Sequence, residues 1–186
     1  KAGPIFSNIV LVDEINRAPA KTQAALFEAM EERQVSVDGR TYPLGVPFMI
    51  VATQNPIEHE GTYRLPEAQL DRFLFKIDVG YPDEQQEVAL MMRSQEGLAR
   101  LSPEHVHAVI SPEQLAWARG LVHGVRCDEK LVRYIAAIIH TTRTDRALML
   151  GASPRASLAI LRASKAAAAI QGRDFVVPED IQLVMP

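Results

Sequence analysis

The sequence has a single cysteine, Cys127, so no disulfide can form within the chain. This is compatible with a reducing compartment, where thiols persist. No apolar run reaches the roughly 20 residues that a membrane-spanning helix needs, and the first residues lack the pattern of a secretory signal peptide. We therefore expect a soluble domain of the cytoplasm, without a membrane span.

The chain also lacks an excess of charge of either sign. It has 20 Lys and Arg residues against 23 Asp and Glu residues, a formal net charge of -3. Proteins that bind nucleic acid through its phosphates usually carry a basic surface, so nucleic acid is not expected as a partner. Hydrophobic residues make up 47% of the 186 residues and charged residues 23%. These values favour a folded domain over a disordered chain.

The most informative segment is an apolar run that ends in two acids. Residues 9–12, Ile-Val-Leu-Val, are followed directly by Asp13 and Glu14. A short β-branched run predicts a strand covered on both faces of a parallel sheet, whose chemistry lies at the carboxyl ends of its strands. There, Asp13 could hold Mg²⁺ and Glu14 could polarise a water that attacks a terminal phosphate. Taken alone, the pair is better explained as two acids that close a buried strand.

A second apolar run, residues 48–53, also ends in polar residues, among them Asn55 before Pro56. It predicts another buried parallel strand that ends at the same crevice of an α/β sheet. Asn55 has both donor and acceptor atoms, so it could align a water between Glu14 and a phosphate. The alternative for Asn55 is a helix cap or an Asx turn before the proline.

Four motifs in this chain together resemble those of the MoxR-type AAA+ ATPases. They are LVDEINRAP at 11–19, ATQNP at 52–56, LPEAQLDRF at 65–73 and GASPRA at 151–156. Their order and spacing cover nearly the whole chain, which makes the resemblance specific. It implies an α/β fold, with a truncated P-loop-type parallel sheet followed by an all-α helical lid. It also implies ATP hydrolysis, with ATP and Mg²⁺ as cofactors.

The resemblance assigns a role to each candidate site residue. Asp13 and Glu14 become the Walker B pair, with Asp13 on the metal, and Asn55 becomes the sensor 1 residue. Arg72 resembles the arginine finger that reaches a neighbouring subunit's nucleotide, and Arg155 resembles the sensor 2 arginine of the lid. A planar, permanently charged guanidinium suits the negative charge spread over a transferring phosphoryl group.

The arginines also have simpler alternatives. Arg72 could form a surface ion pair with Asp71 or Glu67, and Arg155 could lie on a solvated helix face. Arg17 has two open roles, at a subunit interface or as a partner of local carboxylates. If Arg72 acts in trans, an isolated subunit hydrolyses ATP poorly, because a contributed finger is worth about a thousandfold or more in rate.

No segment matches the P-loop, the glycine-rich turn with Gly-Lys-Ser/Thr that holds phosphates with backbone amides. By resemblance, that portion lies upstream of this chain. Its strand would lie between the strand at 48–53 and one that we assign to residues 73–79. We therefore expect the intact protein to be longer. We also expect this chain alone to bind nucleotide weakly and to be inactive.

The pattern divides the chain into two expected domains, a partial α/β core at 1–81 and a helical lid at 82–186. In the core, residues 19–33 predict a helix, and residues 35–42 predict a hairpin with an Asp-Gly turn. By resemblance, the hairpin is the helix 2 insert. It has no cluster of basic residues, so contact with a protein is favoured over contact with DNA. Alternatively, the hairpin only covers a sheet edge.

The second domain is predicted to be helical throughout. Its expected helices are 83–101, 111–123, 128–144, 153–171 and a short one from residue 178. We place Leu158, Leu161, Ala168 and Ile170 in the core of this bundle. In the first domain, the loop at 56–65 is long enough for contact with a subunit or client, or is a solvated connector.

The resemblance implies that the intact protein forms a homo-oligomeric ring, expected to be a hexamer. The ring would use ATP hydrolysis to remodel protein clients, among them proteins with von Willebrand factor A domains. One alternative is a DNA-acting motor related to the minichromosome maintenance helicases, which share the insert. Another is a non-catalytic scaffold that binds partners through the lid bundle.

Overall fold

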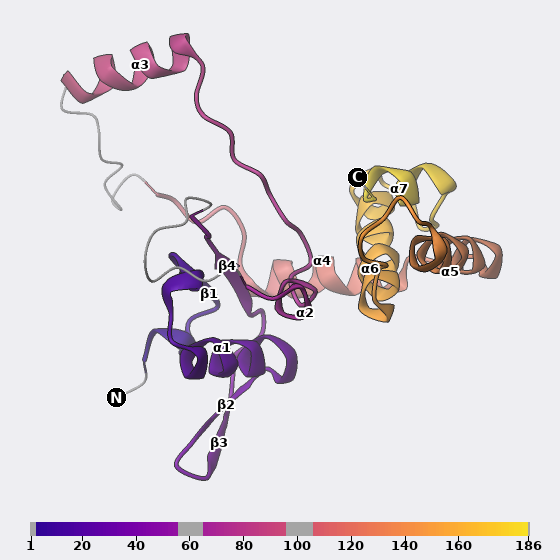
Figure 1. Cartoon of the computed structure of the whole chain (residues 1–186), viewed down its shortest axis with the longest axis horizontal. Helices are drawn as coiled ribbons and strands as arrows, with labels where there is room; N and C mark the ends of the chain where they lie inside the picture. The colour runs from indigo at the N-terminus through magenta and orange to yellow at the C-terminus, as the bar shows by residue number, and fades with distance from the viewer. Residues whose placement is uncertain (1–2, 56–64, 96–105, 186) are drawn as a thin grey trace. The chain divides into compact units, whose positions relative to one another are not determined.

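The computed structural model describes residues 3–55, 65–95 and 106–185 (Figure 1). They belong to two compact units, one formed by 1–74 with 116–186 and the other by 75–115. The boundary expected after residue 81 stays a prediction. Most of the loop expected at 56–65 lies outside the described residues. The α/β class and the helical lid are confirmed.

Two short strands form the parallel sheet. Strand β1 (Ile9–Val12) pairs with β4 (Met49–Ala52), from Ile9 opposite Met49 to Val12 opposite Ala52. Alternate side chains of both strands pack into apolar clusters, as a pleated sheet requires. The other face of the pair, expected to be covered, is exposed in this chain: Ile9, Leu11, Met49 and Val51. Both strands therefore end at the same edge with only one face buried.

Helix α1 (Ala20–Glu32) covers the buried face of the pair. Its residues are mostly strong helix formers, Ala, Leu, Met and Glu. Phe27 and Ala29 are buried, and Phe27 packs with Ile15 and Leu65 in one cluster that also takes in Val12. The helix ends at Arg33, which adopts a left-handed conformation with φ 56°. The expected helix at 19–33 is confirmed to within one residue at each end.

The predicted hairpin is also confirmed. Strands β2 (Gln34–Val37) and β3 (Arg40–Pro43) are antiparallel, with Val37 opposite Arg40. Asp38 and Gly39 between them have φ values of 50° and 73°, the two positive values that a type I′ turn requires. Two short 3-10 turns complete this part of the chain, η1 (Pro4–Phe6) and η2 (Ile15–Arg17).

The strand expected at residues 73–79 is wrong. The chain leaves α2 (Glu67–Leu70) and runs without regular structure up to residue 83. The large apolar side chains here are exposed, with Ile77 at 81% and Val79 at 90%. A strand is stable only when a neighbour takes up its backbone hydrogen bonds. In the described ranges, the sheets contain only the pairs β1–β4 and β2–β3, and no strand lies beside residues 73–79.

All five helices expected in the second half form. They are α3 (Glu84–Gln95), α4 (Pro112–Gly124), α5 (Glu129–Thr144), α6 (Pro154–Ile170) and α7 (Pro178–Leu183). The expected end of the first helix, 96–101, lies outside the described residues. Ser153 caps α6 by accepting hydrogen bonds from the backbone of Arg155 and Ala156, and Gly172 follows the helix with φ 73°.

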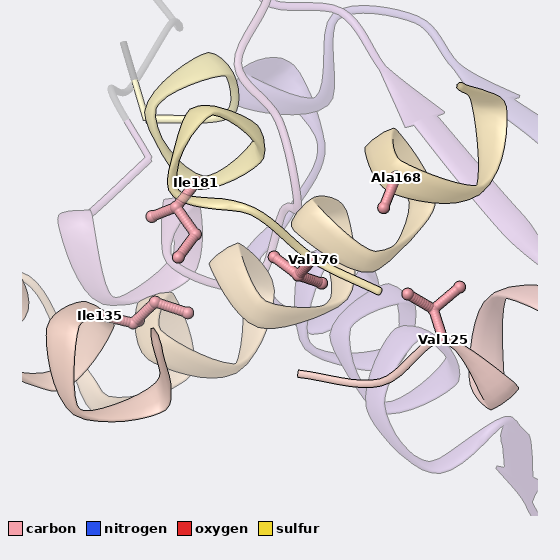
Figure 2. Close-up of a cluster of buried hydrophobic side chains, with 5 residues drawn as sticks. All are labelled: Val125, Ile135, Ala168, Val176 and Ile181. Carbon is pink, nitrogen blue, oxygen red and sulfur yellow. The ribbon is translucent and has the colours of Figure 1, made fainter. Parts of the chain in front are cut away.

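The lid has its own hydrophobic core. Figure 2 shows its five buried side chains, Val125, Ile135, Ala168, Val176 and Ile181. Of the four residues that we expected in this core, Ala168 is buried and Leu161 packs against the cluster. The prediction is wrong for Leu158 and Ile170, because their side chains are 53% and 86% exposed. Helical spacing identifies the apolar side of α6, but the packing of α5 and α7 against it decides which of its apolar residues become buried.

A buried ion pair fixes α7 on this core. The carboxylate of Asp180, 1% exposed, accepts from both Arg173 Nη atoms at 2.6 and 2.7 Å. It also accepts from the backbone N–H of Val177 at 2.9 Å. The hydrogen bonds from Arg173, helped by that of Val177, hold the pKa of Asp180 below its ordinary value although burial opposes the shift.

Replacing Asp180 by Asn should lower the free energy of unfolding by about 2 kcal/mol at pH 7, because Arg173 loses its buried anion. Urea unfolding measures this. Since the folded pKa lies below the unfolded value, wild-type stability from this pair is complete above about pH 4. It is lost as pH falls through the folded pKa. The Asn variant should show no such loss from this position.

The matched control is Asp174→Asn, which breaks an exposed ion pair with Arg126 at 3.3 Å. Such pairs contribute little, so the change should stay within about 0.5 kcal/mol. Equal losses in the two variants would contradict the role given to Asp180.

Candidate functional site

The carboxyl ends of β1 and β4 meet at Thr53. Its hydroxyl donates to Asp13 Oδ1 at 2.5 Å and accepts from the backbone N–H of Glu14 at 2.9 Å. Its own backbone bonds to Val12 O at 2.9 Å and to Ile15 N at 3.0 Å. Four hydrogen bonds from one residue therefore hold the acidic pair at the sheet edge, as the two apolar runs predicted.

Glu14 has an unusual backbone conformation. Its φ of 48° and ψ of 52° lie in the left-handed region, which residues other than glycine seldom adopt. Such conformations persist where the surroundings enforce them, and they concentrate at functional sites. Here Thr53 bonds the amide of Glu14, and Arg17 Nε lies 3.1 Å from Glu14 Oε2. Of the two roles considered for Arg17, the structure shows contact with a local carboxylate.

Asn55 lies two residues beyond Thr53 and is half-buried. Asn55 therefore follows the carboxyl end of β4, while Asp13 and Glu14 follow the carboxyl end of the neighbouring strand, β1. This is the sheet edge at which ligands bind in open α/β sheets.

The two candidate arginines share one carboxylate. Arg72 Nη1 lies 2.5 Å from Oε2 of Glu31, and Arg155 Nη2 pairs with Oε1 of the same group. Arg155 Nη1 is also 3.7 Å from Asp71 Oδ2. Asp71 Oδ1 in turn accepts from the hydroxyl of Ser153 at 2.6 Å. The partner of Arg72 is thus Glu31, rather than Asp71 or Glu67.

The acids and the arginines rest on one apolar cluster. The guanidinium of Arg72 lies over the ring of Phe27, 5.3 Å from its centre, a favourable cation–π geometry. Phe27 packs in the cluster that contains Ile15, just after Glu14, and Val12, just before Asp13. The predicted site residues therefore fall into two groups, one around Thr53 and one around Glu31.

The donors at the sheet edge suit a magnesium ion that arrives with phosphates. Mg²⁺ keeps several waters and binds one or two carboxylates together with phosphate oxygens. Asp13 would supply one carboxylate, and the Thr53 hydroxyl holds that carboxylate in place. Within the described ranges, no three or more His, Cys, Asp or Glu side chains form a group that could hold a metal. The residues fit Mg²⁺ as a companion of the nucleotide.

Sequence reasoning missed two residues of this site, Thr53 and Glu31. A hydroxyl at the end of an apolar run was a usable signal for Thr53, since a polar group there needs a partner. Nothing in the sequence around Glu31 points to Arg72 or Arg155, which lie 41 and 124 residues away.

Two family models match the chain. Residues 1–75 match the ATPase family associated with various cellular activities (AAA), and residues 140–186 match the AAA lid domain. No helix in the described part of the chain combines the length and apolar character that a membrane crossing requires.

Individual proteins are similar over nearly the whole chain. The "Uncharacterized protein YeaC" of Bacillus subtilis is 47% identical over 188 residues, which are 100% of this chain and 57% of that protein. "Chaperone MoxR1" of Mycobacterium tuberculosis is 44% identical over 99% of this chain and 50% of that protein. A crystal structure from Cytophaga hutchinsonii has a TM-score of 0.86 and 42% identity, covering 99% of this chain and 58% of that one. The chain thus spans only half to three-fifths of the length of these relatives.

Thr53→Val keeps the shape of the side chain but removes the hydroxyl that joins Asp13 to the Glu14 amide. Two exposed hydrogen bonds are lost, so the free energy of unfolding should fall by about 1–2 kcal/mol in urea titrations. Thr53→Ser should recover most of it. Thr41→Val, on an exposed strand of the hairpin, is the control and should change stability by less than about 0.5 kcal/mol. If Thr53→Val proved as stable as this control, Thr53 would lose the role given to it.

Proposed function

We propose that this chain, which belongs to the MoxR-type AAA+ ATPases, carries the hydrolytic acids and the lid of an enzyme that converts ATP to ADP and phosphate. The observation that carries the proposal is the acidic pair Asp13–Glu14, held by Thr53 at the carboxyl edge of two parallel strands. This is where open α/β sheets bind nucleotides.

The residues at the sheet edge have distinct parts in the proposed reaction. Bound Mg²⁺ supplies charge neutralisation at the phosphates. Asp13 would hold that ion, and Thr53 fixes the carboxylate of Asp13 in place. Glu14 polarises the attacking water, and Asn55 aligns the water with the terminal phosphate.

The two arginines supply positive charge to the terminal phosphate. Arg72 is proposed to act as the finger on a neighbouring subunit's nucleotide, and Arg155 as the sensor 2 residue of the lid. A guanidinium presents several N–H donors in a fixed plane, which matches phosphate oxygens. We propose that the full-length protein is a homo-oligomeric ring, a hexamer, in which each subunit completes the site of the next.

The work done by the ring is proposed to be the remodelling of proteins. One relative is named a chaperone. The hairpin β2–β3 extends from α1 and has Arg40 as its only basic residue, which favours contact with a protein over contact with DNA. Proteins with von Willebrand factor A domains remain the proposed clients, and the cytoplasm the proposed location.

The domain assignment also stays a proposal. Residues 1–81 would provide the hydrolytic core, and residues 82–186 the lid that closes over nucleotide. Lid closure excludes water other than the attacking one, a common way to complete such a site.

Glu14→Gln in the full-length protein should leave ATP binding unchanged and lower turnover by about a hundredfold or more, because the base is lost. Equilibrium nucleotide binding and phosphate release measure the two effects separately. Glu28→Gln, on α1 beside Ser36, is the matched control and should keep full turnover. Unchanged turnover in Glu14→Gln would exclude Glu14 as the base.

Mixing variants tests the action of Arg72 across subunits. Arg72→Ala alone should lower turnover by about a thousandfold. In mixed rings, an Arg72→Ala subunit retains Glu14, and a neighbouring Glu14→Gln subunit supplies Arg72. Phosphate release should therefore recover in part when the two inactive variants are combined. Mixed rings that form yet stay inactive would show that Arg72 acts within its own subunit.

A further inference from the structure

We propose that Glu31 is a positioning residue that holds Arg72 and Arg155 as one pair, so that the lid sets the place of the finger. The inference rests on the proposed function, because it concerns the two arginines of that site. It adds a residue that belongs to none of the four motifs on which the family resemblance was based.

The contacts form a closed set among three short segments of the chain, at Glu31, at residues 71–72 and at residues 153–155. On the side of the core, Arg72 pairs with Glu31, and the preceding residue, Asp71, accepts from Ser153. On the side of the lid, Arg155 pairs with Glu31 and lies near Asp71. The hydroxyl of Ser153 at the same time caps α6, so the first turn of that helix is tied to Asp71 through its cap.

The charges in this set balance. Two guanidinium groups face two carboxylates. The exposed fraction of the side chain is 27% for Arg72 and for Asp71, 33% for Glu31 and 49% for Arg155. Partial burial weakens the screening of charges by water, so the loss of the Glu31 carboxylate should weaken the electrostatic stabilisation of both arginines. Without Glu31, Arg72 and Arg155 would repel each other, with only Asp71 left to offset them.

Both Glu31 and Arg155 occupy unfavourable ends of their helices. Glu31 lies in the last turn of α1, where the helix dipole disfavours negative charge. Arg155 lies in the first turn of α6, where the dipole disfavours positive charge. Their pairing compensates both penalties at once. Neither charge is favoured by its own helix, so the contact between the two side chains accounts for both placements.

The pairing leaves each arginine able to bind phosphate. Glu31 contacts Arg72 through Nη1 and Arg155 through Nη2. A guanidinium has five N–H donors, so each retains several for phosphate oxygens. The carboxylate of Glu31 contacts one nitrogen of each guanidinium. It can therefore orient both groups while their other N–H donors stay available for phosphate oxygens. Moving the lid then moves Arg72 through the shared anion.

The test is Glu31→Gln in the full-length protein. The amide keeps the size of the side chain but lacks the charge, so kcat for ATP should fall by about tenfold while KM changes less than about twofold. Glu31→Asp, which keeps the charge, should recover part of kcat. Glu32→Gln is the matched control, because Glu32 is the next residue of α1 and accepts a hydrogen bond from Gln34 at 2.7 Å. Its kcat should stay within about twofold of wild type.

A second background shows whether Glu31 acts through the arginines. In a protein that already carries Arg72→Ala and Arg155→Ala, adding Glu31→Gln should lower kcat no further. A further loss of about tenfold in that background, or a full kcat for Glu31→Gln in the wild-type background, would overturn the inference. A wild-type protein without ATP turnover would instead refute the proposed function.

The contact itself is tested without nucleotide by a double-mutant cycle on unfolding with Glu31→Gln and Arg155→Gln. The two effects should be non-additive, because each change removes the same ion pair. Additive effects would overturn the inference even if the protein proved to be an active ATPase.

Discussion

The parallel pairing of β1 with β4 is the constraint on which the candidate site depends. Parallel strands in register bring their carboxyl ends to the same edge, so Asp13 and Thr53 meet although 40 residues separate them. The hydroxyl of Thr53 then forces the turn at Glu14 by bonding its amide. Moving one strand by a single residue would turn Thr53 to the other face and separate it from Asp13. The chemistry at this edge thus follows from strand register.

The lid solves a different problem, the placement of a cation at the start of a helix. Ser153 caps α6 and fixes where its first turn begins, and the cluster around Ala168 and Ile181 fixes the helix on its neighbours. The Asp180–Arg173 pair secures α7 on the same core. Arg155 is therefore presented by a helix whose start and packing are both determined inside the lid.

The sequence predicted local structure well where local chemistry decides it. The run at 9–12, the Asp38-Gly39 turn and the Ser153 cap all depend on neighbouring residues, and each formed as expected. Prediction failed where the structure of a segment depends on contacts with residues far along the chain. Residues 73–79 have the composition of a strand but find no strand beside them in the described ranges, and Ile170 has helical spacing but no neighbour to cover it. Thr53 and Glu31 were missed for the same reason, since their contacts are remote.

The conflicts between local preference and observed placement carry the most information about function. Glu14 adopts a left-handed backbone, Glu31 is an acid at the negative end of α1, and Arg155 is a base at the positive end of α6. Each costs stability locally, and each is offset by a contact made from far along the chain. A fold that only needed to be stable would remove these costs by simple substitutions. That it keeps them at residues proposed to polarise the water, to position the arginines and to bind phosphate argues that the same contacts serve the proposed reaction.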